Sequence, residues 1–249
     1  MGLFGKKKET PKKEKSDAEV KLEKENEMYK IAPLQIGDEV PNFTCDSQLG
    51  MLTFHDVLDG QFGMLVTFPR DFEATATTEL GMIAKLQDEF EARNVKIFAL
   101  SVDTKLNHRR WMDDVQELQD CTITFPLLTD TDASVSKVFG LVRPDAAEGM
   151  EARNVVPAGL VVLVDMDRRV RFISQYPSST GRNFYEIIRT IDALQLTLFH
   201  SVSTPANWMQ GEDVFVKNEV SANAAGAMFP KGFVAIKEWF RITPQPDKV

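Results

Sequence analysis

Cysteines and histidines are the residues of this chain most able to act as nucleophiles, bases or metal ligands, and they are few. The 249 residues include two cysteines, Cys45 and Cys121, and three histidines, His55, His108 and His200. Disulfide scaffolds and zinc sites need more cysteines, or histidines at close spacing such as His-x-x-x-His. The composition therefore excludes a disulfide scaffold and gives no support for a metal centre, and no cofactor is expected.

Neither cysteine has the sequence surroundings of a reactive thiol. Cys45 lies in a segment predicted to be extended, with no base beside it, and Cys121 precedes a predicted strand. Reactive cysteines lie at helix N-termini or beside cationic side chains that lower the thiol pKa. We therefore interpret both as small, buried, unreactive side chains. Thr77 and Thr78 have no neighbouring histidine or lysine, which favours helix caps over nucleophiles.

Charge is distributed unevenly along the chain. The formal net charge is −8, and residues 1–30 contain nine lysines against seven acidic residues, so the remaining 219 residues carry −10. An acidic body argues against a nucleic-acid-binding protein. The first 16 residues contain six lysines: Lys6, Lys7, Lys8, Lys12, Lys13 and Lys15. Because this segment has too few large apolar residues to offset the entropy of folding, residues 1–30 are predicted to form a disordered basic arm.

This basic arm is a candidate attachment point. Gly2 is the residue that N-myristoylation modifies, but Lys6 stands where that signal requires Ser or Thr. Three interpretations stay open: a solubilising tail, a tether to a membrane surface, or a docking segment for an acidic partner such as a cytoskeletal polymer. The longest apolar run, residues 155–164, is shorter than the roughly 20 residues of a transmembrane helix. We therefore expect a cytoplasmic protein, held at a membrane or cytoskeletal structure if the arm tethers it.

Strands and helices are predicted to alternate along the middle of the chain. Apolar runs predict strands at 63–68, 95–102, 123–128, 160–164 and 170–174. Three- and four-residue spacings predict helices at 77–93, 106–118, 133–139 and 183–198, the last with Asn183 and Glu186 as a capping box. This pattern indicates an α/β fold with a mixed sheet, in which ligands bind beyond strand carboxyl ends, here between residues 68 and 78. We expect a main domain over 31–198 and a small β-rich domain over 199–249.

Short motifs in this frame resemble those of one-cysteine peroxiredoxins that carry an extra C-terminal domain. They run in the family's order from about residue 34 to residue 246. They include PNF at 41–43, FHD at 54–56, PRDF at 69–72, TTEL at 77–80, ALSVD at 99–103, TGRNF at 180–184, LQLT at 194–197, FPKG at 229–232 and TPQP at 243–246. The resemblance implies a thioredoxin-like fold, a mixed central sheet flanked by helices, and usually a homodimer built partly by edge-to-edge pairing of sheets.

The same resemblance implies a reaction for which this chain lacks the residues. In the family, a cysteine in the first turn of a helix attacks the peroxide O–O bond as a thiolate and becomes a sulfenic acid. Ala76 stands at the position of that cysteine, Phe68 where one-cysteine members usually carry a histidine, and Glu73 in place of a threonine that bonds the peroxide. Leu160 is aligned with the second active-site arginine. An engineered knockout would leave its neighbours unchanged, so the four changes together indicate a naturally degenerate site.

A residual pocket is expected around Pro69, Thr77 and His55, with His55 as a structural hydrogen-bonding residue at its edge. Some one-cysteine peroxiredoxins also carry a lipase-type Ser-His-Asp site. Here Gln61 stands at the serine position, so His55, with Asp130 or Asp132, does not complete a triad.

The sequence therefore predicts a peroxiredoxin-like pseudoenzyme that acts as a structural or binding protein. Its expected partners are a second copy, an active peroxiredoxin in a mixed dimer, and a membrane surface or cytoskeletal structure through the arm. Two alternatives stay open: an enzyme, either a divergent thiol peroxidase with a relocated cysteine or a lipase-type enzyme, and a chaperone acting as a ring-sized oligomer.

Overall fold

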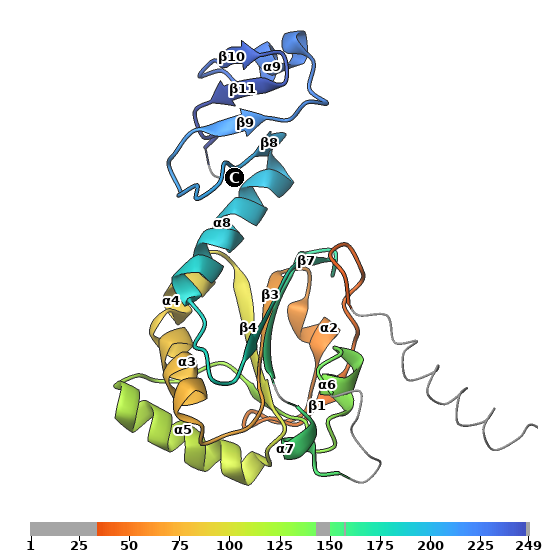
Figure 1. Ribbon diagram of the computed structural model, residues 1–249, viewed down its shortest axis with the longest axis vertical. Coiled ribbons are helices and arrows are strands. Elements are labelled where there is room, and N and C mark those ends of the chain that lie inside the picture. The colour runs from red at the N-terminus through yellow and green to blue at the C-terminus, as the bar shows by residue number, and fades with distance from the viewer. Residues whose placement is uncertain (1–33, 143–149, 157, 248–249) are drawn as a thin grey trace, which may run out of the picture. The chain divides into compact units, whose positions relative to one another are not determined.

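The computed structural model describes residues 34–142, 150–156 and 158–247, so the predictions for the arm at 1–30 lie outside the described residues. Its centre is a five-stranded sheet (Figure 1), and the strand order is β5-β4-β3-β6-β7. The strands are β3 (Phe62–Phe68), β4 (Val95–Ser101), β5 (Leu127–Thr129), β6 (Ala158–Val164) and β7 (Val170–Pro177). β3, β4 and β5 run parallel, whereas β6 and β7 pair antiparallel. The predicted thioredoxin-like fold with a mixed sheet is confirmed.

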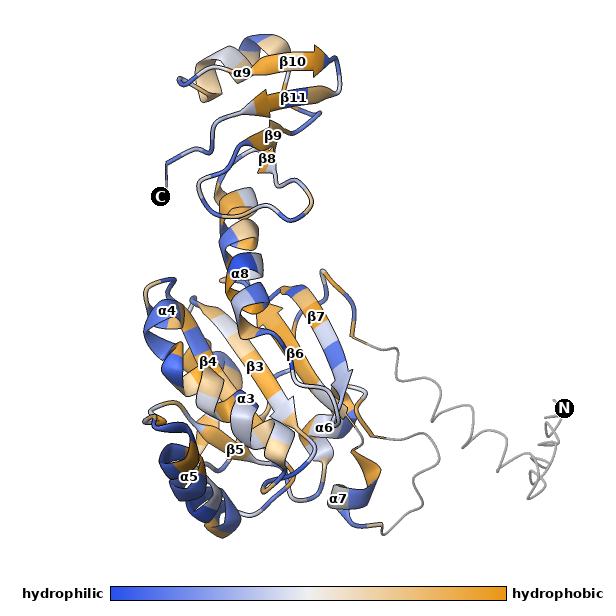
Figure 2. Cartoon of the chain, turned by 60° about the vertical axis from the view of Figure 1, so that its left-hand side comes forward, coloured by the Kyte–Doolittle hydropathy of each residue, from blue (hydrophilic) through white to orange (hydrophobic). Residues whose placement is uncertain are grey.

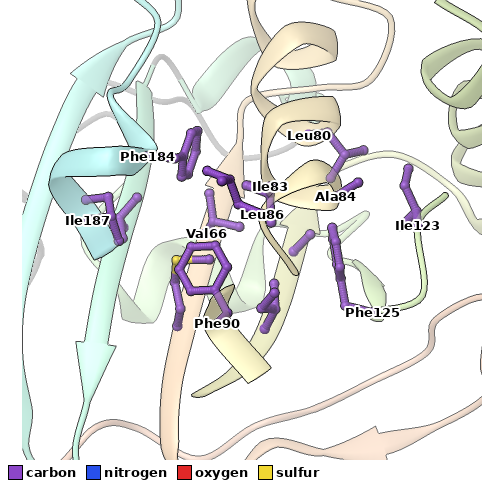
Figure 3. Close-up of a cluster of buried hydrophobic side chains, with 14 of the residues drawn as sticks. Val66, Leu80, Ile83, Ala84, Leu86, Phe90, Ile123, Phe125, Phe184 and Ile187 are labelled. Carbon is purple, nitrogen blue, oxygen red and sulfur yellow. The ribbon is translucent and has the colours of Figure 1, made fainter. Parts of the chain in front are cut away.

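Both faces of this sheet are covered, which explains why β3 is buried along its whole length and mostly apolar (Figure 2). Alternate side chains of β3 enter two separate cores: Met64, Val66 and Phe68 lie in one, and Leu65 lies in the other. The first core is covered by α3 (Ala74–Lys85), α4 (Gln87–Glu91), α5 (Lys105–Gln119) and α8 (Phe184–Phe199). Figure 3 shows side chains of α3, α4 and α8 meeting over β3 in that core. The second core lies against α2 (Phe54–Leu58), α6 (Ser134–Val138) and α7 (Ala152–Val155).

Two predicted elements differ in kind from the observed ones, and β7 also ends three residues later than predicted. The helix predicted at 77–93 is two helices: α3 begins three residues earlier, at Ala74, and the chain breaks at Leu86, where φ is −101° and ψ is 5°. The strand predicted at 123–128 shrinks to the three residues of β5. Pro126 has no N–H for a strand ladder, and the Gln48 side chain instead bonds the Phe125 carbonyl and the Leu127 N–H, each at 2.8 Å.

The remaining strands form two small sheets. β1 (Thr44–Cys45) pairs with β2 (Leu52–Thr53). A four-stranded C-terminal sheet has the order β10-β11-β9-β8, formed by β8 (Val202–Ser203), β9 (Val214–Val216), β10 (Val234–Lys237) and β11 (Phe240–Thr243). Helix α9 (Ala222–Met228) joins it around the buried Trp208. The β-rich C-terminal part is thus confirmed, while the domain division at residue 198 stays a prediction. Within the described ranges, no helix is both long and apolar enough to cross a bilayer.

Helix α8 begins where the sequence predicts it. The Asn183 side-chain oxygen accepts hydrogen bonds from the backbone N–H groups of Tyr185 at 3.1 Å and Glu186 at 3.3 Å. The second half of the predicted capping box differs, because the Glu186 carboxylate is paired with Arg189, Oε2 to Nε, at 2.6 Å. Asn183 therefore supplies the N-cap through its own oxygen.

Replacing Asn183 with alanine is expected to lower the free energy of unfolding by about 1 kcal/mol, because two backbone donors lose their acceptor. Asn183→Asp keeps the oxygen and serves as the matched control. Urea unfolding followed by circular dichroism measures the difference. Equal midpoints for the two variants would contradict the assignment of the cap.

Candidate degenerate active site

Ala76 lies in the first turn of α3, beyond the carboxyl end of β3, where the sequence predicts a ligand site. The loop of residues 69–73 joins the two elements, and the Thr77 N–H closes the first helical turn onto the Glu73 carbonyl at 2.8 Å. Ala76 is buried and presents only a methyl group. The first turn of α3 therefore holds, at position 76, a side chain that has no nucleophilic atom.

The cavity beside Ala76 has a volume of about 10 Å³, which is room for about one water molecule. Its described lining residues include Pro69, Glu73, Ala76, Glu79, Gly159, Tyr176 and Arg182. Among the residues that line it there is neither a cysteine nor a histidine. Pro69 is where it was predicted, at the cavity wall. Ordinary ligand pockets are more than tenfold larger, so this one is nearly filled by the protein itself.

A buried ion pair fills much of this site. The Arg182 guanidinium binds the Glu79 carboxylate in bidentate fashion, Nε to Oε1 at 2.8 Å and Nη2 to Oε2 at 2.6 Å. Arg182 Nη1 donates to the carbonyls of Thr67 at 3.2 Å and Leu160 at 3.1 Å. The guanidinium also lies 5.1 Å from the centre of the Phe68 ring. Glu79 therefore neutralises the charge of the guanidinium, and the remaining hydrogen bonds of Arg182 go to backbone carbonyls of the sheet.

Phe68 was predicted as a pocket residue, but it does not line the cavity and instead packs against the Arg182 guanidinium. Its ring packs edge-on against Trp111, with the ring centres 5.7 Å apart. Trp111 Nε1 donates in turn to Thr77 Oγ1 at 2.9 Å. Thr77 was predicted as a pocket residue, but it does not line the cavity and instead anchors the tryptophan that supports Phe68.

Glu73 places a carboxylate at the N-terminus of α3. It is the N-cap residue, and its Oε1 accepts a hydrogen bond from Arg70 Nε at 2.6 Å. A negative charge at this end of a helix is favourable for the helix dipole. The same charge opposes formation of a thiolate in the first turn, which is the reverse of what the peroxidase reaction requires.

The prediction that Leu160 faces the pocket is wrong by one residue. Its side chain lies in the second core, on the face of the sheet opposite Ala76. Because side chains alternate along β6, the preceding Gly159 faces the cavity instead. A Cβ on Gly159 would lie 2.8 Å from the Thr67 carbonyl oxygen and 3.1 Å from Arg182 Nη1. Arg182 therefore occupies the space that a side chain at position 159 would need.

The prediction that His55 belongs to the residual pocket is also wrong. His55 lies in α2, and its Nε2 is 2.8 Å from the Val40 carbonyl oxygen, so it acts as a structural hydrogen-bonding residue elsewhere. The lipase-type residues are not brought together either. The Gln61 amide donates to Asn94 Oδ1 at 2.7 Å. The Asp130 carboxylate accepts from the backbone N–H groups of residues 135 and 136, at the start of α6.

Both cysteines have environments that disfavour a thiolate. Cys45 lies in β1 and is buried in the second core, across the sheet from Ala76. Burial, followed by the nearby charges of Asp130 and Asp132, raises the pKa of its thiol to about 12. Cys121 is half-buried after α5, and burial raises its pKa as well. Burial thus disfavours the thiolate form of both cysteines.

The sequence analysis missed a buried polar network at the carboxyl ends of β3 and β4. His108 Nδ1 lies 2.7 Å from Asp71 Oδ2, and Ser101 Oγ donates to Asp71 Oδ1 at 2.5 Å. The Asp71 N–H donates to Asp103 Oδ2 at 2.9 Å. These four side chains are buried, so they fix the loop before α3 rather than meet a substrate. The acidic residues of the PRDF and ALSVD motifs, each just after a strand, were the sequence signal from which this network could have been predicted.

Among the described residues, no group of three or more histidine, cysteine, aspartate or glutamate side chains could hold a metal ion.

Comparisons with known proteins agree with this frame. The AhpC/TSA family matches residues 36–173, and the C-terminal domain of 1-Cys peroxiredoxin matches residues 193–232. The chain is 43% identical to a 1-Cys peroxiredoxin of Dictyostelium discoideum, over 86% of this chain and 87% of that protein. It is 39% identical to Peroxiredoxin-6 of Rattus norvegicus, over 86% and 98% of the two chains.

Solved structures give the same result for the three-dimensional fold. A mutant of Peroxiredoxin 6 of Arenicola marina superposes with a TM-score of 0.77 at 37% identity, covering 86% of this chain and all of the other. A yeast mitochondrial 1-Cys peroxiredoxin, described for thiol resolution through glutathione and thioredoxin systems, has a TM-score of 0.77 at 36% identity, covering 85% and 99%.

Proposed function

Since the chain belongs to the peroxiredoxins of the AhpC/TSA family, we propose that it is a member which no longer performs the family's reaction and acts by binding other molecules. The observation that carries this proposal is the site around Ala76. A methyl group stands in the first turn of α3, beside a cavity of about 10 Å³ that is lined by no cysteine among the described residues. Attack on a peroxide O–O bond needs a sulfur nucleophile that can be oxidised, and alanine has none.

The surroundings of Ala76 support the same proposal. Each group that would activate a thiol is absent from the cavity or committed elsewhere. The Arg182 guanidinium is neutralised by Glu79, the apolar Phe68 ring packs against that guanidinium, and Glu73, paired with Arg70, places a carboxylate at the N-terminus of α3. A site maintained for thiolate chemistry places positive charge and donors at the sulfur.

The proposed partners follow from the fold, the net charge and the basic arm of the chain. The peroxiredoxin fold favours a homodimer, or a mixed dimer with an active peroxiredoxin. The net negative charge of the residues that follow the arm favours partners other than nucleic acid. The arm at residues 1–30 supports a cytoplasmic protein held at a membrane surface or a cytoskeletal structure through Gly2 and its lysines.

A fluorescent fusion of the full chain is expected to lose this localisation when residues 1–30 are deleted. An unchanged location would remove the arm as the targeting element.

The second candidate function is a thiol peroxidase that uses Cys45 or Cys121, and family membership is the observation that favours it. With a thiol pKa of about 12, roughly 10⁻⁴ of Cys45 is thiolate at pH 8. The raised pKa of Cys121 also lowers its thiolate fraction. A relocated reaction would therefore have to proceed with poorly ionised thiols.

Peroxide consumption by the purified full chain, with excess thiol reductant, separates the two candidates. We expect no turnover above the reductant blank, and the same result for Cys45→Ala and Cys121→Ala. Mass spectrometry after low-dose peroxide is expected to show both sulfurs unoxidised in the folded protein. Turnover that either substitution abolishes would establish the thiol peroxidase and overturn the proposal.

A further inference from the structure

The loop of residues 69–73, which leads from β3 into α3, contains a strained residue. Phe72 has a φ of 60°, in the left-handed region, although it carries a bulky side chain. A residue other than glycine is unfavourable there, because its Cβ comes close to the following carbonyl oxygen. The Phe72 side chain is 48% exposed, so burial of the ring only partly accounts for this conformation. Strained backbone of this kind persists only where neighbouring contacts fix the chain.

The contacts that fix this loop are made by Asp71, the residue before Phe72. Its Oδ1 accepts a hydrogen bond from Ser101 Oγ at 2.5 Å, and its Oδ2 lies 2.7 Å from His108 Nδ1. Its backbone N–H donates to Asp103 Oδ2 at 2.9 Å. Asp71 is 1% exposed, so water does not take the place of these partners. The carboxylate therefore holds the loop to the end of β4 and to α5.

His108 faces a hydrogen-bond acceptor at each ring nitrogen. Nδ1 faces the Asp71 carboxylate, and Nε2 lies 3.1 Å from the Leu128 carbonyl oxygen in β5. An ionised carboxylate and a carbonyl oxygen can only accept, so both contacts are hydrogen bonds only when both nitrogens carry a proton. The side chain is fully buried. A neutral imidazole has one N–H and would leave one of the two acceptors unsatisfied.

The charged groups around this pair come from the loop, from α5 and from the segments after β4 and β5. Asp103, after β4, accepts from the Asp71 N–H and, at 2.9 Å, from the Asn107 amide. Asp130, after β5, accepts from backbone N–H groups at the start of α6. The others pair with each other or are exposed: Arg70 with Glu73, Lys105 with Asp46, and Arg109 on the surface of α5. Among the described residues, the cation in contact with the Asp71 carboxylate is thus the His108 imidazolium.

We propose that the second proton on the His108 ring is a latch for the loop of residues 69–73. With this proton, the imidazolium neutralises Asp71 and joins the loop to β5. When the proton is lost, Asp71 becomes a buried carboxylate without a counter-charge, and one of the two acceptors loses its donor. The strained backbone at Phe72 is then no longer held, so a rise in pH releases the loop. The latch does not depend on whether the peroxidase reaction is lost.

The direction of the pH dependence follows from proton binding. A histidine in an unfolded chain gives up this proton near about pH 6.5, whereas the buried pair keeps it for its hydrogen bonds. The folded state then binds one proton more than the unfolded state, so stability falls as the pH rises, by up to about tenfold in the unfolding equilibrium constant per pH unit. The stabilisation is fully present below about pH 6 and is lost at higher pH.

Urea unfolding of the full chain at pH 6 and pH 8.5 tests this dependence. The unfolding equilibrium constant is expected to rise at least about tenfold between the two pH values, and less than about threefold in His108→Gln, because an amide does not titrate. His55→Gln is the matched control: His55 lies in α2, where its Nε2 faces the Val40 carbonyl, and its loss is expected to leave the pH dependence unchanged. Circular dichroism checks the folding of each variant.

Two further measurements need no substitution at His108. Ring ¹⁵N chemical shifts, with His55→Gln and His200→Gln to identify the other two histidines, are expected to show both His108 nitrogens protonated at pH 7. Hydrogen exchange of a peptide covering residues 68–76, corrected for the intrinsic rate, is expected to lose at least about tenfold protection between pH 6 and pH 8.5, unlike a peptide from α8. A singly protonated His108 ring at pH 7, the same pH dependence in His108→Gln as in the unsubstituted chain, or an equal loss of protection in both peptides would each overturn the proposal.

Discussion

Replacing Ala76 with cysteine is expected to leave peroxide turnover at least about 100-fold below that of a one-cysteine relative measured in the same assay. Supplying the sulfur alone does not supply its environment. Loss of one preorganised donor from an active site commonly lowers turnover by about 10²–10³-fold, and this chain has Phe68 and Glu73 at two positions where the family resemblance implies donors. The Arg182 guanidinium is committed to Glu79, and its Nη1 donates to two backbone carbonyls.

The thiol introduced by Ala76→Cys is also expected to have a higher pKa than a helix N-terminus normally confers. The helix dipole lowers the pKa of a first-turn thiol, but the Glu73 carboxylate at the N-cap opposes that effect. Burial at this position works in the same direction, because it disfavours the charged form. Thiolate absorbance near 240 nm, followed as a function of pH, measures this pKa directly.

The control is a variant that restores the surroundings as well. Ala76→Cys combined with Glu73→Thr and Phe68→His removes the opposing carboxylate and replaces an apolar wall with an imidazole. We expect a lower thiol pKa and at least tenfold higher turnover than in Ala76→Cys alone. Turnover by the single variant within tenfold of the relative would show that the frame is still competent and that the sulfur is the sole loss.

The sequence predicted the frame well because its apolar runs match the buried strands. β3 and β4 were placed to within one residue, since a strand covered on both faces is mostly apolar, and only Thr67, Lys96 and Ser101 interrupt the two apolar runs. A run of apolar residues does not, however, show which face of the sheet each side chain is on, because apolar and polar residues do not alternate along it. In β6 the run of apolar residues has no alternation to read, so Leu160 was assigned to the cavity face that Gly159 occupies.

The contents of the site were less predictable, because they depend on residues distant in sequence. Arg182 and Glu79 are 103 residues apart, and nothing in either motif indicates that the two side chains pair. His108 and Asp71 are likewise 37 residues apart. Arg182 lines the small cavity and its guanidinium also packs over the Phe68 ring, a contact that no local pattern encodes. The absence of a cysteine at position 76 was readable from the sequence, whereas the ion pair beside it was not.

Removing one partner of the Arg182–Glu79 pair is expected to be the most destabilising single change in this part of the fold. Both side chains are more than nine-tenths buried, with 3% and 7% of their surfaces exposed. Removing one member of a buried pair leaves an uncompensated charge and typically costs about 3–5 kcal/mol. Arg182→Met also deprives the Thr67 and Leu160 carbonyls of their donor, whereas Glu79→Met leaves the guanidinium without its counter-charge.

Urea unfolding of Arg182→Met, Glu79→Met and the double variant measures this coupling. Each single variant is expected to lose about 3–5 kcal/mol, and the double variant less than the sum, because it leaves no buried charge. Lys231→Met is the matched control: its pair with Asp247, at 2.6 Å, is exposed, and such pairs contribute about 0–1 kcal/mol. Additive losses in the double variant would mean that the two residues act separately. The coupling between Arg182 and Glu79 would then no longer account for the burial of two charged side chains beside Ala76.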